Sequence, residues 1–423
     1  MLKDAGERRE KSGAMNRSNE RLDVLIAGAG IAGLSLALAL ARALKPNFAL
    51  AVCDAALARP PARDERVSAI AAGGRQLLEG LGIWEEIAGD AQPIRAMEIT
   101  DSHLEDAVRP AFLHFDAAAD DEAPLAHMVE HRPLLAALRA AAAKADVRLI
   151  ASEVEGFAAE DAALGVRLAD GSTPPARLLV AADGAQSKTR KAAGIRATSW
   201  GYGQSGIVAT IGHERDHAGR AEQHFLPAGS FAILPLRGRR SSIVWTEASG
   251  EAARLVALSP EEFKEELLRR FGLALGEIEV LAPPSAYPLS FAIARRFVGE
   301  RVALVGDAAH VVHPLAGQGL NLGLRDVAAL AECVADAAHL GLDPGGPETL
   351  ARYERWRRFD TAMMAGATDG LNRLFSNRSE ALRVVRDVGL GIVERLPGLK
   401  QYFAKEAAGL AGDVPRLLRG EGL

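Results

Sequence analysis

Cysteine is nearly absent from this chain of 423 residues. Cys53 and Cys333 are the only two, and they stand in unrelated sequence contexts. We therefore expect neither a disulfide framework nor a cysteine zinc site, and we predict no metal site of any kind. So little cysteine, with no paired spacing, fits a protein of the reducing cytoplasm.

An excess of basic charge is also missing. The chain carries 50 Lys and Arg against 55 Asp and Glu, a formal net charge of -5. Nucleic-acid-binding proteins usually show a basic patch or stripe, so we expect no nucleic-acid partner.

A single long uncharged run, residues 24–41 (VLIAGAGIAGLSLALALA), reaches the length of a membrane span. Gly28, Gly30 and Gly33 cluster in its first half, where they would weaken a helix most. We therefore predict a strand, a glycine turn and a helix instead of a span. Residues 1–20 mix both charges and lack the basic start of a signal peptide, and we expect them to be disordered.

The hydrophobic pattern predicts an α/β protein. Continuous apolar runs at both ends of a helix, DVLIAGAG and FALAVCD (48–54), are typical of buried parallel strands. Residues 68–87 and 132–145 have helical patterns, and the chain is helical again from about 347. Between 196 and 286 the pattern alternates, which predicts an antiparallel sheet, and Ser259 with Pro260 begins a polar helix.

The first motif is G-A-G-I-A-G, residues 28–33, placed after a strand and at the start of a helix. Such glycines permit a tight turn and let backbone amides approach a pyrophosphate. Asp54 ends the second strand, where a carboxylate can accept a hydrogen bond from a ribose hydroxyl. Position, spacing and the acidic partner together predict a dinucleotide site.

The second motif is Asp183-Gly184, which follows the apolar strand LLVAA. Taken alone, this dipeptide is more typical of a turn than of a ligand site.

The third motif is GDAAHVVHPLAGQGLNLGLRD, residues 306–326, between the short strand VALV and a long helical pattern. Asp307 lies at the carboxyl end of that strand, where ligands bind in parallel sheets. The amides of 317–321 lie at the start of the next helix, near the positive end of its dipole. We predict a cradle for negative charge, formed around a second part of the same cofactor.

These three motifs, in this order, resemble those of the FAD-dependent aromatic hydroxylases, the single-component flavoprotein monooxygenases. The resemblance implies FAD as cofactor, NAD(P)H as electron donor and attack on an aromatic ring by a C4a-hydroperoxyflavin. It places the first motif and Asp54 on ADP, Arg66 on the phosphates, and Asp183 and Gly184 beside the pyrophosphate. It also places Asp307 on the ribityl chain, and Pro314 and Gly317 to Asn321 against the isoalloxazine ring. The implied cofactor-binding residues are Gly28, Gly30, Ile31, Ala32, Gly33, Asp54, Arg66, His131, Asp183, Gly184, Gly306, Asp307, Pro314, Gly317, Gln318, Gly319, Leu320 and Asn321.

The run HPLAGQGLNLGL is similar to that of the ubiquinone-biosynthesis hydroxylases within this family, and the likeness covers residues 22–412. Two positions depart from the usual pattern. Asp54 replaces a glutamate, and His131 replaces an amide side chain. We expect His131 to keep a hydrogen-bonding role, although a titratable group that tunes the pocket is the alternative.

The resemblance implies hydroxylation of a polyprenylated phenol with O2 on the way to ubiquinone. The alternatives are a hydroxylase of a small soluble aromatic compound and a non-catalytic scaffold of a quinone-biosynthetic complex. No catalytic base stands out, since lone histidines such as His224 and His310 are more often structural. The basic run 352–360 is most simply a solvated helix face, with contact to anionic lipid as the alternative. The expected location is cytoplasmic, with peripheral contact to the inner face of the membrane or to other quinone-biosynthesis proteins as an option.

The expected fold is a Rossmann-like FAD-binding domain with an interleaved antiparallel-sheet substrate domain and a C-terminal helical region. The predicted boundaries follow in one list: 1–20 as a disordered tail, 21–195 and 287–345 as the FAD-binding domain with substrate-side excursions near 96–124, 196–286 as the substrate domain, and 346–423 as C-terminal helices.

Overall fold

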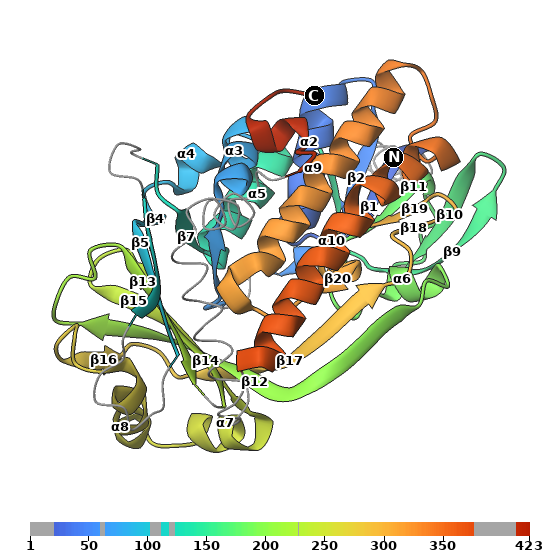
Figure 1. Cartoon of the computed structure of the whole chain (residues 1–423). Coiled ribbons are helices and arrows are strands. Elements are labelled where there is room, and N and C mark those ends of the chain that lie inside the picture. The colour runs from blue at the N-terminus through green and yellow to red at the C-terminus, as the bar shows by residue number, and fades with distance from the viewer. Residues whose placement is uncertain (1–20, 60–63, 102–110, 118–122, 227, 376–411) are drawn as a thin grey trace, which may run out of the picture.

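The computed structural model describes residues 21–59, 64–101, 111–117, 123–226, 228–375 and 412–423. The predicted disordered tail, 1–20, lies outside the described residues. Figure 1 shows a sheet covered by long helices and a second sheet below it, joined by the long strand β12. The protein is therefore a mixed α/β fold, as the sequence predicts.

The first sheet is built from the continuous apolar runs. Its strand order is β18-β19-β11-β1-β2-β8, and Val24, Leu25 and Ile26 of the central strand are completely buried. The strands from β19 to β8 run parallel, while β18 and a β9–β10 hairpin pair antiparallel at its margins. The strands are β1 Leu22–Ala27, β2 Leu50–Cys53, β8 Arg148–Ile150, β9 Val154–Glu160, β10 Ala163–Leu168, β11 Pro175–Ala181, β18 Val298–Gly299 and β19 Val302–Leu304.

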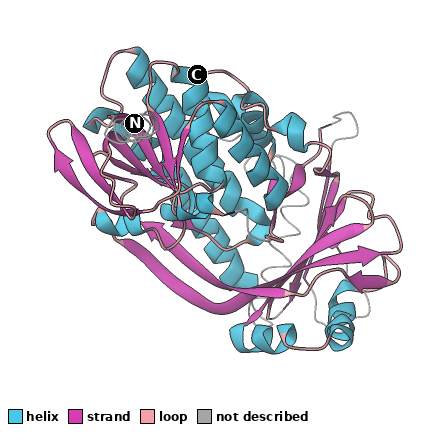
Figure 2. Ribbon diagram, turned by 180° about the vertical axis from the view of Figure 1, so that it is seen from behind, coloured by secondary structure: helices cyan, strands magenta, loops and turns pink. Residues whose placement is uncertain are grey.

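Helices cover this sheet, as Figure 2 shows from behind. The run 24–41 forms β1 and most of α2, and no helix of the described residues is long and apolar enough to cross a membrane. Helix α2 packs against α9 and α5. The helices of the region around the first sheet are α2 Ile31–Leu44, α3 Ala72–Gly80, α4 Trp84–Ile87, α5 His131–Lys144, α6 Lys188–Ala192, α9 Gln318–His339 and α10 Pro347–Phe375.

The second sheet has the order β20-β17-β12-β15-β14-β13-β5-β6, with β16 beside β12. Its pairs are antiparallel except β13–β5. Its strands are β5 Ala96–Asp101, β6 Ala111–Asp116, β12 Ala197–His213, β13 Arg220–Leu226, β14 Gly229–Leu236, β15 Arg240–Ala248, β16 Ile278–Val280, β17 Ser285–Ala294 and β20 His310–Val311. Most of β17 and all of β20 come from the predicted FAD-binding segment 287–345, so the two regions are interleaved. The predicted domain division itself stays a prediction.

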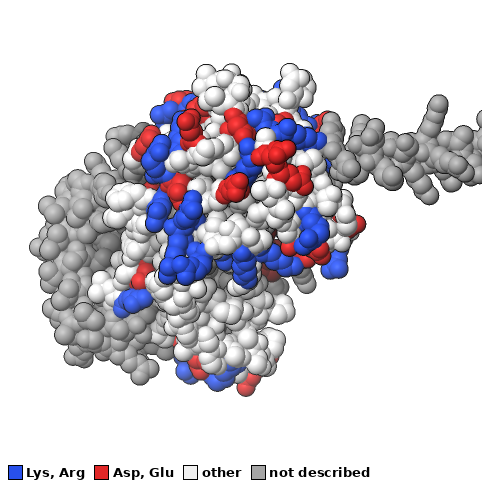
Figure 3. Space-filling model, turned by 90° about the vertical axis from the view of Figure 1, so that its right-hand side faces the viewer, with Lys and Arg blue, Asp and Glu red and all other residues white. Residues whose placement is uncertain are grey.

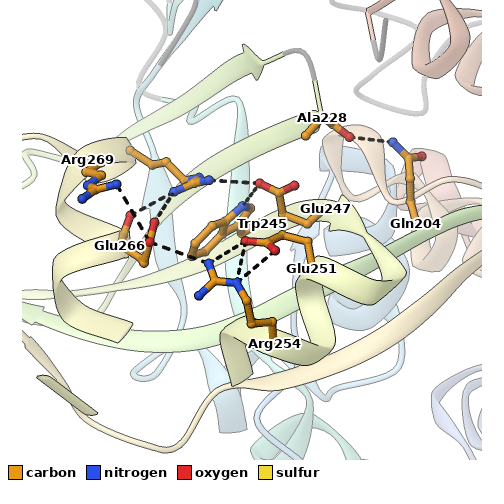
Figure 4. Close-up of polar contacts among 9 residues, drawn as sticks. Gln204, Ala228, Trp245, Glu247, Glu251, Arg254, Glu266 and Arg269 are labelled. Atoms are coloured by element: carbon orange, nitrogen blue, oxygen red, sulfur yellow. Dashed lines mark hydrogen bonds and ion pairs between the residues drawn. The ribbon is translucent and has the colours of Figure 1, made fainter. Parts of the chain in front are cut away.

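Two helices pack behind the second sheet, α7 (Ser249–Val256) and α8 (Pro260–Phe271). Ser259 caps α8 in a reciprocal capping box with Glu262, which confirms the helix start expected from the sequence. Trp245 is buried beneath α8, and its indole donates to Glu247 at 3.0 Å (Figure 4). The core of this region is therefore distinct from that of the first sheet.

A third, small sheet connects the two regions and corrects one prediction. The helical pattern expected over 68–87 begins in fact with a strand, β3 (Val67–Ile70). This strand pairs antiparallel with β7 (Ala126–Glu130), which also pairs with β4 (Gln92–Ile94). The β-branched and apolar residues of VSAI satisfy a strand as well as a helix, and the distant pairing with β7 decides between them.

The basic run 352–360 on α10 was predicted to be a solvated helix face, and that prediction is wrong for its inner side. Tyr353 and Arg357 are buried, at 0% and 1% exposure. The Tyr353 hydroxyl donates to the carbonyl of Leu304 at 2.6 Å, which anchors α10 to the end of β19. The helices predicted beyond Phe375 lie in 376–411, outside the described residues, and a short 3-10 helix, η4 (Arg416–Arg419), follows.

Both cysteines are buried and free, Cys53 at the end of β2 and Cys333 on α9. Burial raises the pKa of each thiol to about 12. Figure 3 shows Lys and Arg interspersed with Asp and Glu on one face of the molecule, without a large field of one sign. Among the described residues, no cluster of three or more His, Cys, Asp or Glu could hold a metal.

Candidate cofactor site

The predicted motifs follow four adjacent parallel strands, in the order β19-β11-β1-β2. Asp307 follows β19, Asp183 follows β11, Gly28 follows β1 and Asp54 follows β2. Because the carboxyl ends of parallel strands meet at one edge of a sheet, these four positions share that edge. The structure thus brings together motifs that lie up to 279 residues apart (307 - 28) in the chain.

The three glycines of the first motif differ in the space around them: two are in close contact with the backbone, and the third faces open space. A Cβ on Gly28, whose φ is +114°, would meet the carbonyl oxygen of Ala182 at 2.3 Å. The segments that follow β1 and β11 can therefore lie this close together only because residue 28 is a glycine. A Cβ on Gly33 would meet the carbonyl oxygen of Gly28 at 2.0 Å. Gly30 differs, since a Cβ there would meet nothing within 4 Å. The space beside Gly30 is open at the sheet edge, where a ligand could approach.

The N-terminus of α2 is also free of competing protein groups. Gly30 is its N-cap, no side chain caps it, and its first turn contains no acidic residue. Uncapped amides and the positive end of the helix dipole favour an anion at this position. The residues present therefore fit a diphosphate group.

Asp54 holds the glycine turn in place. Its Oδ2 accepts from the amide of Ala29 at 2.8 Å, and its Oδ1 accepts from the amide of Ala56 at 2.8 Å. The carboxylate is thereby fixed beside the first motif, with acceptor capacity left on both oxygens. Its predicted bond to a ribose hydroxyl is compatible with this geometry and stays a prediction.

Asp183 caps the helix that follows it. Its carboxylate accepts from the hydroxyl of Ser187 and from the amide of Thr189, the latter at 3.0 Å. Gly184 has a φ of +80°, as the expected turn requires. The side chain therefore has a local structural role, while the backbone of Asp183 lies against Gly28. Contact with the pyrophosphate stays a prediction for this pair.

Asp307 differs from the other acidic residues of the site. It is exposed between buried neighbours, Gly306 and Ala308, and bonds to no other residue that the structure describes. A free carboxylate at the end of a parallel strand suits hydrogen bonds from the hydroxyls of a sugar alcohol. The predicted ribityl contact therefore fits the geometry.

The glycine-rich loop forms an open helix start at Gly317, the N-cap of α9, which has a φ of +64°. No side chain caps this helix and its first turn contains no acidic residue. The side chain of Asn321 faces the protein: its Oδ1 accepts from Ala71 at 3.0 Å and its Nδ2 donates to Ala69 at 2.8 Å. The amides at the start of α9, and not this side chain, are the groups that can stabilise an anionic ring.

Arg66 and His131 lie beside this loop in one polar chain. Arg66 makes a bidentate ion pair with Asp64, with Nε–Oδ1 at 2.8 Å and Nη2–Oδ2 at 2.7 Å. The His131 Nε2 lies 2.7 Å from the hydroxyl of Ser68. His131 thus has the hydrogen-bonding role expected from the sequence, although contact with a cofactor stays a prediction.

The two histidines weighed as catalytic groups are both engaged in the protein. His224 Nδ1 lies 2.8 Å from the hydroxyl of Thr100, and Nε2 lies 3.3 Å from Glu222. His310 Nε2 lies 2.6 Å from Asp326, within the buried region under the third motif. Both contacts favour the structural interpretation.

Sequence reasoning missed the residues that support the site. Asp326 is fully buried, accepts from the amide of Gly306 at 3.0 Å, and binds both His310 and Arg357. Burial opposes its charge, but the charges of His310 and Arg357 outweigh burial and lower the pKa of Asp326. The one signal in the sequence was that Asp326 ends the third motif, residues 306–326. Asp64 was missed too, although it stands two residues before Arg66.

Comparison of structures identifies a solved protein with the same fold. The fold matches the crystal structure of the p-nitrophenol 4-monooxygenase PnpA from Pseudomonas putida with a TM-score of 0.75 at 19% identity, over 93% of this chain and all of that one. At this identity the likeness shows the fold alone, which this chain shares with that monooxygenase.

The sequence gives the family. Residues 21–365 match the family model described as an FAD binding domain. The chain is 44% identical to the ubiquinone hydroxylase UbiL of Rhodospirillum rubrum, over 98% of this chain and 97% of that protein. It is 34% identical to the 3-demethoxyubiquinol 3-hydroxylase of Escherichia coli, over 93% of this chain and all of that protein. The chain therefore belongs to the FAD-dependent monooxygenases, and FAD is its cofactor.

Proposed function

We propose that the protein is an FAD-dependent monooxygenase that hydroxylates the ring of a polyprenylated phenol in ubiquinone biosynthesis, with NAD(P)H and O2. The observation that carries the proposal is the likeness to a ubiquinone hydroxylase, at 44% identity over nearly the whole of both chains. The convergence of the three cofactor motifs and Asp54 on one sheet edge independently supports the use of FAD.

The residues of the chain would share the work of holding the cofactor. The amides at the start of α2, beside Gly30, would bind the diphosphate, and Asp54 would accept from the ribose. Asp307 would accept from the ribityl chain, and the amides at the start of α9 would stabilise negative charge on the ring. Bound FAD supplies the reduction of oxygen and its transfer to the aromatic ring.

The test is mass spectrometry of lipid extracts from a strain in which the gene is deleted. The expected result is accumulation of a prenylated phenol that lacks one ring oxygen, and its structure identifies the carbon that is hydroxylated. Complementation with the wild type should restore ubiquinone, whereas the Asp307→Ala variant should not. A normal quinone profile in the deletion strain would instead favour a small soluble aromatic substrate, and full rescue by Asp307→Ala would favour a scaffold.

We also propose that the protein contacts the membrane surface peripherally, because a polyprenyl substrate resides in the bilayer. Supporting this, Phe359 and Met363 of α10 are 75% and 61% exposed, one helical turn apart, beside the exposed Arg355 and Arg358. Apolar side chains flanked by arginines suit an anionic lipid surface. Flotation with vesicles that contain phosphatidylglycerol should carry the wild type and lose a Phe359→Ser/Met363→Ser variant. No flotation of the wild type would overturn the proposal, and equal flotation of both would assign the contact to another surface.

A further inference from the structure

The polar chain of Asp64, Arg66, Ser68 and His131 is fixed by the small sheet. The amide of His131 donates to the carbonyl of Arg66 at 3.0 Å, which places the end of β7 beside the start of β3. From there the His131 ring reaches Ser68 through Nε2 at 2.7 Å, and its Nδ1 lies 3.8 Å from Asp64 Oδ2. The histidine therefore lies between a hydroxyl and the carboxylate that holds Arg66.

The ion pair leaves one edge of the guanidinium free. Asp64 occupies Nε and Nη2 of Arg66, while Nη1 donates to none of the residues that the structure describes. The Arg66 side chain is 57% exposed, but that of Asp64 is only 23% exposed. A guanidinium held side-on in this way presents its outer donors in a fixed direction, which suits bidentate recognition of phosphate.

The small sheet places Arg66 near the cofactor edge: Ala69 of β3, three residues further on, lies against Gly317 and accepts from the Asn321 side chain at 2.8 Å. The hydrogen bond to Asp64 is the main cause of the raised pKa of Arg66, and the negative charges of Asp64 and Asp307 raise it further. Asp307 follows β19 at the cofactor edge. Arg66, which directly precedes β3, is therefore near the edge on which the three motifs and Asp54 converge.

We propose that Asp64 and His131 are positioning residues that orient the Arg66 guanidinium toward the diphosphate of FAD. This inference rests on the proposed FAD-dependent function and assigns Asp64 a role that its charge alone would not predict. By itself an aspartate near a diphosphate repels it. Fixed against Arg66, it instead removes the rotational freedom of a long side chain before the cofactor arrives, so less entropy is lost on binding.

Asp64 is suited to this role because it remains charged. Burial opposes its ionisation, but the interactions with His131 and Arg66 outweigh burial and hold the pKa of Asp64 well below its usual range. The ion pair is therefore complete at every pH at which the enzyme would operate.

The test is titration of the flavin-free full-length protein with FAD, followed by the quenching of flavin fluorescence. Asp64→Asn should weaken FAD binding about tenfold, since it removes a charge-assisted bidentate contact. Arg66→Ala should weaken binding at least as much, and adding Asp64→Asn to it should cause no further loss, because Asp64 acts through Arg66. Arg66→Lys keeps the charge but loses the fork, and it should fall between wild type and Arg66→Ala.

A matched pair elsewhere supplies the control. Arg254 and Glu251 on α7 form a similar bidentate contact, with Nε–Oε2 at 3.0 Å and Nη2–Oε1 at 2.6 Å, in the second region (Figure 4). Glu251→Gln should leave FAD affinity unchanged. Thermal unfolding of each flavin-free variant separates lost affinity from lost folding.

His131 is tested by a pair of variants. His131→Gln restores the amide typical of the family and can still bond Ser68, so FAD affinity should stay within about twofold of wild type. His131→Ala removes both contacts and should weaken FAD binding several-fold. Equal losses in the two variants would overturn a hydrogen-bonding role for this residue.

Two outcomes would overturn the role of Asp64. Tighter FAD binding by Asp64→Asn would mean that the carboxylate merely repels the diphosphate. An equal loss from Asp64→Asn with and without Arg66 would mean that it acts on folding and not through Arg66. Neither outcome would change the quinone profile expected for the deletion strain, so the proposed function would stand. Failure of the wild type to bind any FAD would overturn the proposed function as well.

Discussion

Arg357 Nε lies 2.8 Å from Asp326 Oδ1, and both side chains are almost completely shielded from solvent. Asp326 also accepts from Gly306 of the third motif, so this ion pair connects helix α10 to the cofactor edge of the sheet. A buried pair of this kind is costly to break from one side, because the remaining charge cannot be solvated.

Replacement of Arg357 by Met should therefore destabilise the protein strongly. We expect a loss of about 3–5 kcal/mol in the free energy of unfolding, measured by chemical denaturation of the flavin-free protein. Arg352→Met, on the same helix but 44% exposed, is the control and should cost less than about 1 kcal/mol. Similar losses for both would contradict the importance of burial.

Gly28→Ala and Gly30→Ala should have different consequences. At Gly28 the methyl group would collide with the backbone of Ala182 and require a left-handed conformation, so the variant should unfold at a much lower temperature. At Gly30 the methyl group meets no protein atom, and the variant should fold normally but retain little FAD. Thermal unfolding of the flavin-free proteins and their flavin content after reconstitution decide the outcome. A Gly30→Ala protein with full flavin content would contradict the predicted approach of the cofactor.

Asn321→Ala should destabilise the start of α9 without placing new atoms in the cofactor site. The side chain bonds Ala71 and Ala69 across the start of α9, and its loss leaves two backbone groups without these partners. We expect a cost of about 1–3 kcal/mol in stability together with reduced flavin content. Asn321→Asp keeps the acceptor but loses the donor, and it should show an intermediate or greater cost. Unchanged stability in both variants would contradict the role assigned to this amide.

Asp307→Ala, unlike Asn321→Ala, should lower FAD affinity with little effect on stability. The side chain is exposed and pairs with no other described residue, so stability should change by less than about 0.5 kcal/mol. FAD affinity should fall, since a carboxylate at the end of β19 would be lost from the cofactor. Flavin fluorescence titration and denaturation, on the same preparation, give both quantities. A large loss of stability would show that Asp307 is structural.

Acid should weaken the protein through its buried histidines. Burial lowers the pKa of His313 to about 4, whereas a histidine in an unfolded chain titrates near about 6.5. Between these pH values the unfolded state binds a proton that the folded state excludes. The free energy of unfolding should therefore fall by about 2–3 kcal/mol as the pH is lowered from about 6.5 to about 4. His313→Asn should show a shallower fall in the unfolding free energy from pH 7 to pH 4. A parallel fall in both proteins would contradict this source of acid sensitivity.

His127 supplies an independent comparison, because burial lowers its pKa to about 4 as well. Its ring contacts Trp84, outside the cofactor edge. His127→Asn should therefore flatten the same pH dependence while leaving FAD affinity unchanged. Changes in flavin content here would contradict the separation of the two sites.

Much of the cofactor edge could be predicted from the sequence, because its determinants are local. The glycine turn after β1, the carboxylate after β2 and the open start of α9 each follow from a few adjacent residues. The capping box at Ser259 is predicted for the same reason. Short motifs in a parallel α/β pattern also imply a shared edge, which the strand order confirms.

The remaining features depend on distant partners. Strand β3 pairs with β7, about sixty residues further along the chain, and nothing within VSAI indicates that pairing. Arg357 belongs to a run that looks solvated until Asp326 of α9 is placed beside it. Asp64 gains its role only from the positions of Arg66 and His131. Such contacts are set by tertiary packing, which local propensity does not contain.

The order of the strands in the first sheet has a consequence for synthesis on the ribosome. The strands that carry the cofactor motifs begin at Leu22 and end at Leu304, and the buried partner of the third motif, Arg357, emerges later still. A nascent chain therefore cannot complete its cofactor edge until some five-sixths of its length has been translated, counted to Arg357 of 423 residues. Until then β1, β2 and β11 expose apolar surface that β19 and α9 will cover. Flavin binding and protection from aggregation should therefore both occur late in translation, and together.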